Sequence, residues 1–204
     1  GMAHVRRLRI KAFFFTAFKP SLLISFRESD LRLSFARRRW AVRKYDAHDY
    51  YLGLSGAHLK GVDFLAVQEG RRLVFLEVKN YAGPAGRRLS PEPLAAELTG
   101  KIADTFTGID AICTMLERKR LYRFASPLLP YLPAQNYDWP FWHQAGALSG
   151  LPRKCTAVLC LENTTEELRR ELQPRLQEGL QGIVGRILFA EAGSRPLPGL
   201  HIDR

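Results

Sequence analysis

One apolar stretch of the chain ends in two charged side chains of opposite sign. The segment LVFLEVKNY, residues 73–81, is a run of aliphatic and aromatic residues with Glu77 and Lys79 on either side of Val78. Side chains two apart in a strand point to the same face, so the carboxylate and the ammonium would lie side by side. Because both faces are apolar, the pattern predicts a central strand buried on both sides. Ionised groups there are costly unless they are paired, hydrogen-bonded or bound to a metal.

A further carboxylate begins the preceding apolar segment. The segments VDFLAV and RLVFLEVK read as two strands joined by the turn-like QEGR at residues 68–71. A three-residue loop at 69–71 would place Asp63 opposite Glu77 on the same face. A two-residue loop at 69–70 would instead put the two carboxylates on opposite faces. Three-residue loops with a residue in the left-handed conformation are common, so we expect the carboxylates to meet.

Two carboxylates in that register would form a site for a cation. With Cβ atoms about 5 Å apart, they would either raise one pKa or recruit a divalent ion. Carboxylate oxygens, completed by the carbonyl of Val78 and by waters, suit Mg²⁺ or Mn²⁺. Lys79 could orient or help to deprotonate an attacking water and could stabilise charge on a phosphate. These groups suit metal-assisted hydrolysis of phosphodiester bonds.

The order of these residues resembles the signature of the PD-(D/E)XK nucleases, which share the restriction-endonuclease-like fold. The matching residues are Asp63, a strand and turn, and then Glu77-Val78-Lys79. The stretch GAHLKGVDFLAVQEGRRLVFLEVKNY is similar to the strand-turn-strand core of that family, although the proline before the first aspartate is absent. The resemblance implies a nuclease that binds a divalent metal through Asp63, Glu77 and the carbonyl of Val78, with Lys79 catalytic.

Other residues could support such a site. The family often adds an acidic residue from the helix before the hairpin, and Asp46 or Asp49 could serve, although Asp46 suits a helix cap equally well. Polar and basic residues at the same end of the hairpin could contact phosphates without reading bases; they are Lys60, Asn80, Tyr81, Arg87 and Arg88. Lys101 on the following helix could join them, although a solvated helix face is the commoner place for a lysine. Arg71 and Arg72 lie at the opposite end and are not assigned to substrate.

The elements that must position these residues follow from the hydrophobic pattern. Residues 31–45 suit either a pair of basic strands or a short helix, and residues 46–54 suit a short helix. Ser90 before Pro91 is a good helix start. Apolar residues then recur at three- and four-residue steps, so a long amphipathic helix should reach about Glu117.

The second half of the chain continues the alternation of strand and helix. CTAVLCLE at 155–162 predicts a buried strand, Thr164 and Glu167 form a capping box for a helix, and GRILFAEA at 185–192 predicts a last strand. This order predicts an α/β fold with a central mixed sheet flanked by helices. The restriction-endonuclease-like resemblance covers roughly residues 46–162.

The length of 204 residues favours one domain. We expect a single nuclease-like domain over 1–204, with a basic N-terminal extension to about residue 45 and an excursion rich in proline and aromatic residues at about 120–153. The prolines there exclude one long helix or a central strand. The aromatic side chains could stack on bases, although packing on the domain or on a second subunit is the commoner role.

Composition narrows the partners. Lys and Arg number 31 against 20 Asp and Glu, giving a net charge of +11, which favours a polyanion such as nucleic acid. The family resemblance makes DNA a better candidate than RNA, and a homodimer is possible by analogy. The three cysteines lack disulfide or metal-ligand spacing, which fits a reducing, cytoplasmic compartment. The apolar run AFFFTAF is too short to span a bilayer, so we expect no membrane partner.

Three functions compete at this point. The first is a divalent-metal-dependent nuclease, an enzyme that hydrolyses phosphodiester bonds. The second is a catalytically inactive nucleic-acid-binding module of the same fold, against which the intact Asp63, Glu77 and Lys79 argue. The third is a membrane-surface or assembly protein that uses the basic, aromatic N-terminal segment, but no clear amphipathic lysine-rich helix supports it. We therefore expect the nuclease.

Overall fold

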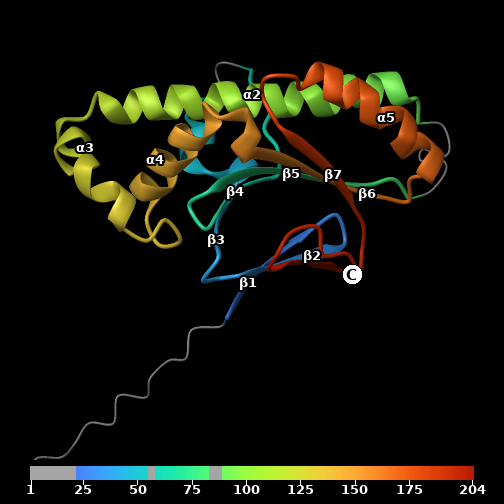
Figure 1. Cartoon of the computed structure of the whole chain (residues 1–204), viewed down its shortest axis with the longest axis horizontal. Helices are drawn as coiled ribbons and strands as arrows, with labels where there is room; N and C mark the ends of the chain where they lie inside the picture. The colour runs from blue at the N-terminus through green and yellow to red at the C-terminus, as the bar shows by residue number, and fades with distance from the viewer. Residues whose placement is uncertain (1–21, 55–57, 83–88) are drawn as a thin grey trace, which may run out of the picture.

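A computed structural model of the chain describes residues 22–54, 58–82 and 89–204. Strands and helices alternate along most of this length (Figure 1). In chain order, the elements are β1 (Leu23–Glu28), β2 (Leu31–Ala36), β3 (Trp40–Lys44), η1 (Tyr45–Ala47), α1 (Asp49–Leu52), β4 (Phe64–Gln68), β5 (Arg72–Asn80), α2 (Pro91–Glu117), α3 (Arg120–Ala125), η4 (Ser126–Tyr131), α4 (Asp138–Ser149), η5 (Pro152–Lys154), β6 (Cys155–Glu162), α5 (Glu166–Gly179), β7 (Arg186–Ala190) and β8 (Leu200–Asp203).

The centre of the fold is a five-stranded sheet of order β3-β4-β5-β6-β7. It is mixed, because β3, β4 and β5 pair antiparallel whereas β5, β6 and β7 run parallel. The predicted α/β class with a mixed sheet is therefore confirmed. Helices α2, α4 and α5 lie on one face (Figure 1), and a three-stranded antiparallel sheet, β1-β2-β8, lies on the other. The expected helical cover is thus present on one face only.

Strand β5 is buried on both faces, as its sequence predicts. Leu73 and Phe75 belong to the helix-side core, the cluster between the central sheet and the helices. Val74 and Leu76 belong to the sheet-side core, the cluster between the two sheets. The alternation places Glu77 on the helix side of the central sheet.

The register of the β4–β5 hairpin is the predicted one. Gln68 pairs with Arg72 and Phe64 pairs with Leu76, which leaves a three-residue loop. Two residues of this loop have left-handed backbone, Glu69 with φ 52° and Gly70 with φ 64°. Asp63, one residue before the ladder, therefore comes opposite Glu77.

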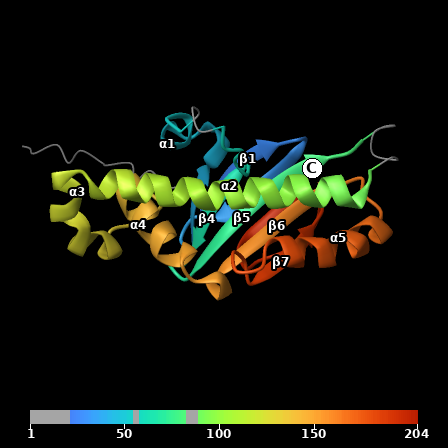
Figure 2. The same cartoon turned by 90° about the horizontal axis from the view of Figure 1, so that it is seen from above.

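Helix α2 crosses the central sheet over β4, β5 and β6 (Figure 2). It runs from Pro91 to Glu117, as predicted, although the side chain of Ser90 makes no capping hydrogen bond. The predicted strand at 155–162 is β6, and its parallel pairing with β5 brings the carboxyl ends of both strands to one edge of the sheet.

Two helix starts differ from the predictions. In the 46–54 region, η1 precedes α1, and the cap of α1 is His48, whose ring accepts from the N–H of Tyr50. Asp46 lies inside η1 and is not its N-cap, a position that Lys44 holds. Helix α5 is capped by Thr165, which accepts from Leu168, because the hydroxyl of Thr164 already donates to a strand carbonyl.

The N-terminal region is more structured than expected. The predicted extension to about residue 45 enters the two sheets from β1 onward. Residues 31–45 form the two strands β2 and β3 and no helix, but the strands lie in different sheets and do not pair with each other as expected. Residues 1–21 lie outside the described part of the chain. The proline-rich excursion at 120–153 forms α3, η4, α4 and η5. None of the helices in the described residues is both long and apolar enough to cross a membrane.

The aromatic side chains of the excursion divide into two groups. Phe141 and Trp142 are fully buried in the helix-side core, which confirms packing on the domain for this pair. Phe124 and Tyr131 are 84% and 85% exposed. Phe124 and Tyr131 therefore lie on the surface of the protein and are not part of its hydrophobic core.

Candidate functional site

The two carboxylates of the hairpin lie together at its open end. Glu77 is 1% exposed and Asp63 is 9% exposed, so both are buried. The N–H of Val78 donates to Oδ2 of Asp63 over 2.7 Å, which fixes Asp63 against β5 beyond the end of the ladder. The N–H and the carbonyl of a strand residue face the same neighbour. The carbonyl of Val78 therefore faces the edge that carries Asp63.

Helix α2 holds the segment that leads to Asp63. The N–H of Val62 donates to Oγ1 of Thr105 over 3.0 Å, and the N–H of Lys60 donates to Asp104 over 2.9 Å. Gly61 is required between them, since a Cβ there would lie 2.8 Å from the ring of Tyr45. These contacts fix the backbone immediately before the site.

Two lysines share the carboxylate of Glu77. Nζ of Lys101 lies 2.5 Å from Oε1 of Glu77. Nζ of Lys79 lies 3.8 Å from the same oxygen and 2.8 Å from Oε1 of Glu97. Lys101 is therefore the direct counter-ion, whereas Lys79 bridges a buried and a half-exposed carboxylate. The structure places Lys101 inside the site and not on a solvated helix face.

The carboxyl groups of the site hold their protons more tightly than usual. Burial raises the pKa of Glu77 to about 7 and Asp63 adds to this, while Lys101 and Lys79 oppose it. Burial also raises the pKa of Asp63, against the opposing effects of the Val78 N–H and Lys101. The site is therefore a place where negative charge is under-compensated.

Two buried carboxylate oxygens have no hydrogen-bond partner among the described residues. They are Oε2 of Glu77 and Oδ1 of Asp46. A buried acceptor without a donor is unfavourable, so each such atom calls for a ligand. A hard cation bound there would satisfy that need for Glu77, and Asp63 and the Val78 carbonyl are the further oxygen atoms that could hold it. Within the described ranges, no three His, Cys, Asp or Glu side chains form a metal-ligating group.

The two extra acidic candidates differ in their positions. Asp46 is near enough to Asp63 to raise its pKa, and burial raises the pKa of Asp46 itself. Asp49 is exposed in the first turn of α1. Of the pair, Asp46 is the one that the fold brings toward the carboxylates.

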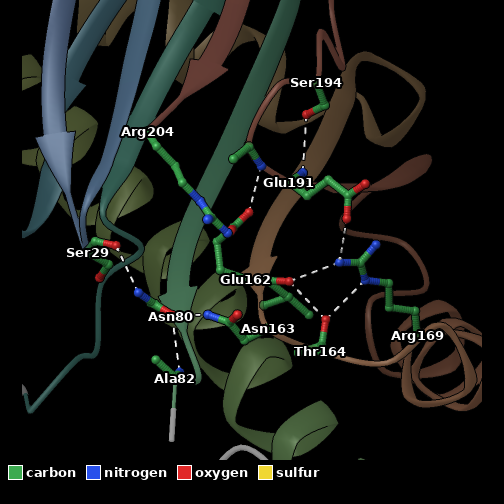
Figure 3. A network of polar contacts seen from close by, with 12 residues as sticks. Ser29, Asn80, Ala82, Glu162, Asn163, Thr164, Arg169, Glu191, Ser194 and Arg204 are labelled. Carbon is green, nitrogen blue, oxygen red and sulfur yellow. Dashed lines mark hydrogen bonds and ion pairs between the residues drawn. The ribbon is translucent and has the colours of Figure 1, made fainter.

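Only some of the residues that were predicted to contact phosphates lie on the side of the sheet that carries the two carboxylates. The side chain of Lys60 is exposed and that of Tyr81 is half-buried on the helix side. Asn80 points to the other face of the sheet, because it is one residue out of phase with Lys79. There it accepts from Asn163 over 2.6 Å (Figure 3). Arg87 and Arg88 lie outside the described residues.

Sequence reasoning named Lys101 of α2 as a candidate but missed Glu97 and Thr105, which complete the wall of the site on the same helix. Glu97, Lys101 and Thr105 are four residues apart and so share one helix face. In the structure these side chains reach Lys79, Glu77 and the backbone of Val62, respectively. The sequence pattern that could have revealed this wall is the recurrence of polar residues every four positions on the helix that follows the hairpin.

Comparisons with protein-family models, with curated proteins and with solved structures found no match to this chain.

Proposed function

We propose that this chain is a divalent-metal-dependent nuclease that hydrolyses phosphodiester bonds, with DNA as the preferred substrate. The observation that carries the proposal is the hairpin register, which sets Asp63 beside Glu77, while Oε2 of Glu77 has no hydrogen-bond partner in the described part of the chain. The likeness of these residues and of Lys79 to the PD-(D/E)XK signature supports the same reaction. The net charge of +11 supports a polyanionic substrate.

Asp63, Glu77 and the carbonyl of Val78 would hold Mg²⁺ or Mn²⁺. Such an ion supplies Lewis acidity and lowers the pKa of a bound water. The raised pKa of Glu77, about 7, means that the carboxyl group must lose a proton before it can act as a ligand. Lys101 favours that ionised form through its short contact with Oε1.

Lys79 is the side chain best placed to act on the substrate. Its side chain is 29% exposed, and its ammonium lies next to Glu77 and is held by Glu97. From there it can donate to a phosphate oxygen and can orient a water molecule. Glu97 keeps Lys79 charged, because their contact lowers the pKa of Glu97 and opposes the effect of burial on the ammonium.

Incubation with labelled DNA tests the proposal. The purified protein would be mixed with single-stranded and double-stranded DNA, and with RNA of the same sequence, in Mg²⁺ or Mn²⁺. We expect cleavage by the wild type, a loss of about a thousandfold in Glu77→Ala, equivalent to about 4 kcal/mol, and about a hundredfold in Lys79→Ala. Glu171→Ala, which removes an exposed glutamate on α5, is the matched control and should cleave like the wild type.

A second candidate is a catalytically inactive nucleic-acid-binding module. The observation in its favour is that Lys101 already occupies Oε1 of Glu77. This candidate predicts that DNA binds with no cleavage in any metal and that Glu77→Ala leaves binding unchanged. That result would overturn the nuclease.

A further inference from the structure

A second charged site lies at the opposite end of the central sheet, where the β4–β5 loop meets η5. It is a cavity of about 460 Å³. Four separate segments of the chain supply its lining, which consists of Arg39, Gln68, Glu69, Arg71, Arg72, Arg153, Lys154 and Pro198. We call it the basic pocket.

Within the described part of the chain, most of the positive charge in the basic pocket has no ion-pair partner. Glu69 is its one acidic residue and pairs with Arg39 over 3.3 Å. Arg72 donates to the neutral Oε1 of Gln68. Arg71, Arg153 and Lys154 are exposed, and none of them forms an ion pair within the described residues; these three and Arg72 therefore lack a carboxylate partner.

The backbone around the pocket is fixed before any ligand arrives. Nε1 of Trp40 and Nε2 of Gln68 both donate to the carbonyl of Pro198, over 3.0 and 3.1 Å. The turn that carries Arg153 packs on Gly185, where a Cβ would lie 2.9 Å from the carbonyl oxygen of Pro152. A rigid frame that holds like charges together loses little entropy when an anion binds.

The chemistry of the pocket matches phosphate. Guanidinium groups present paired donors to phosphate oxygens, and several unpaired cations around one cavity favour a multiply charged anion. The pocket is distinct from the carboxylate site, because Arg72 and Glu77 stand about 17 Å apart along β5 at 3.3 Å per residue. Its ligand would therefore not be the phosphate that is hydrolysed.

We propose that the basic pocket is a phosphate-binding site that takes a phosphate group of a nucleic-acid backbone or a free phosphate. The proposal goes beyond hydrolysis and does not depend on it, since an inactive protein would keep the same pocket. Both ligands offer the same phosphate group to the pocket. They differ in whether a single isolated phosphate ion binds by itself or only as part of a nucleic-acid strand.

The first test is binding of a labelled single-stranded oligonucleotide of about 20 nucleotides, followed by fluorescence anisotropy with a chelator present so that no hydrolysis occurs. Salt dependence is measured as well, because about 0.7 units of slope are lost for each phosphate contact removed. The pocket variant is Arg71→Ala with Arg153→Ala. The matched control is Arg27→Ala with Arg32→Ala, which removes two exposed arginines from the small sheet and changes the net charge equally.

We expect the pocket variant to bind at least tenfold more weakly and with a shallower salt slope, and the control to change affinity less than threefold. Thermal unfolding of both variants checks that each is folded. Titration of inorganic phosphate, followed by NMR of the arginine side chains, is the second arm. Saturation by phosphate that the pocket variant loses identifies a free anion as ligand, whereas pocket-dependent binding of the oligonucleotide alone identifies the backbone. Equal losses in the two variants, with no saturation by phosphate, would overturn the site.

Discussion

Two buried glutamates end neighbouring strands of the same sheet, and their surroundings differ. Glu77, near the end of β5, is 1% exposed, and Glu162, at the end of β6, is 4% exposed. Glu77 faces the helices. Glu162 faces the small sheet, because it is in phase with Cys160 of the sheet-side core.

The partners of Glu162 satisfy both of its oxygens. Oε1 accepts from the N–H of Ala192 over 2.6 Å, and Oε2 lies 3.1 Å from the guanidinium of Arg204 (Figure 3). For Glu77, by contrast, Lys101 contacts only Oε1, and Oε2 has no hydrogen-bond partner among the described residues. Burial is therefore common to both carboxylates, and the incomplete satisfaction of Glu77 is what separates them.

This difference distinguishes a buried carboxylate that stabilises the fold from one that is available to a ligand. A satisfied carboxylate joins parts of the fold, as Glu162 joins β6 to the loop after β7 and to the end of β8. An under-satisfied one stores unfavourable energy that a ligand can relieve. Glu77 is thus the better candidate for a site, although its sequence neighbours are no more polar than those of Glu162.

The largest effect expected from this difference is in the pH dependence of stability. The pKa of Glu77 is about 7 in the folded protein, against an ordinary value of 4.5. The folded state therefore holds this proton more tightly than the unfolded state, so stability falls as pH rises from about 4.5 to 7. The loss amounts to about 3 kcal/mol at 1.36 kcal/mol per pKa unit.

Glu77→Gln should remove that loss. In urea unfolding with a chelator present, the variant should gain about 3 kcal/mol relative to the wild type between pH 4.5 and pH 8. Glu162→Gln is the control and should show no comparable gain, because an amide nitrogen replaces an oxygen that accepts a hydrogen bond. If the free energy of unfolding depended on pH in the same way in the wild type and in Glu77→Gln, Glu77 would not have the raised pKa that distinguishes it from Glu162.

A smaller effect is expected on removing Glu162 itself. Glu162→Ala leaves the part-buried N–H of Ala192 without its acceptor, which costs about 1 kcal/mol. Among the described residues, Glu77→Ala leaves no backbone donor without its acceptor. It deprives the ammonium of Lys101 of its direct counter-ion, but at pH 8 it also removes an under-compensated charge. Chemical denaturation at pH 8 should therefore rank Glu162→Ala as the less stable of the two variants. The reverse order would mean that Glu77 has the structural role.

The sequence was informative where a period of two or of 3.6 residues decides the structure. The alternation along β5 and the length of the loop at 69–71 predicted that Asp63 and Glu77 would meet. Ser90 before Pro91 predicted the start of α2, and the apolar steps along the helix predicted its end. These features are local, so a single segment contains the information that specifies them.

The sequence was less informative where distant segments must meet. The pairing of β2 with β8 joins residues near the two ends of the described chain, and neither short strand specifies its partner. The contact of Lys101 with Glu77 depends on how α2 is rotated over the sheet, which the helix sequence alone does not set. The partners of Glu162 come from loops, where no periodicity exists to be read.

The smallest expected effect compares the two cations that face these glutamates. Lys101 is 18% exposed beside Glu77, whereas Arg204 is 73% exposed beside Glu162. Because Lys101 opposes the rise in the pKa of Glu77, Lys101→Met should raise this pKa further. Stability should then continue to fall with rising pH, over a range that ends about one unit higher than in the wild type. This is the smallest change usually seen when a carboxyl group loses a neighbouring opposite charge.

Arg204→Met should leave that range unchanged and cost less than about 1 kcal/mol, since the solvent screens an ion pair with so exposed a partner. Urea unfolding of the two variants at several pH values measures both quantities. If Lys101→Met leaves the range where it is, the ammonium does not act on the buried carboxylate, and Glu77 keeps its unusual proton affinity through burial and Asp63 alone. The two glutamates would then differ in how completely their oxygens are bonded and not in how their counter-ions act.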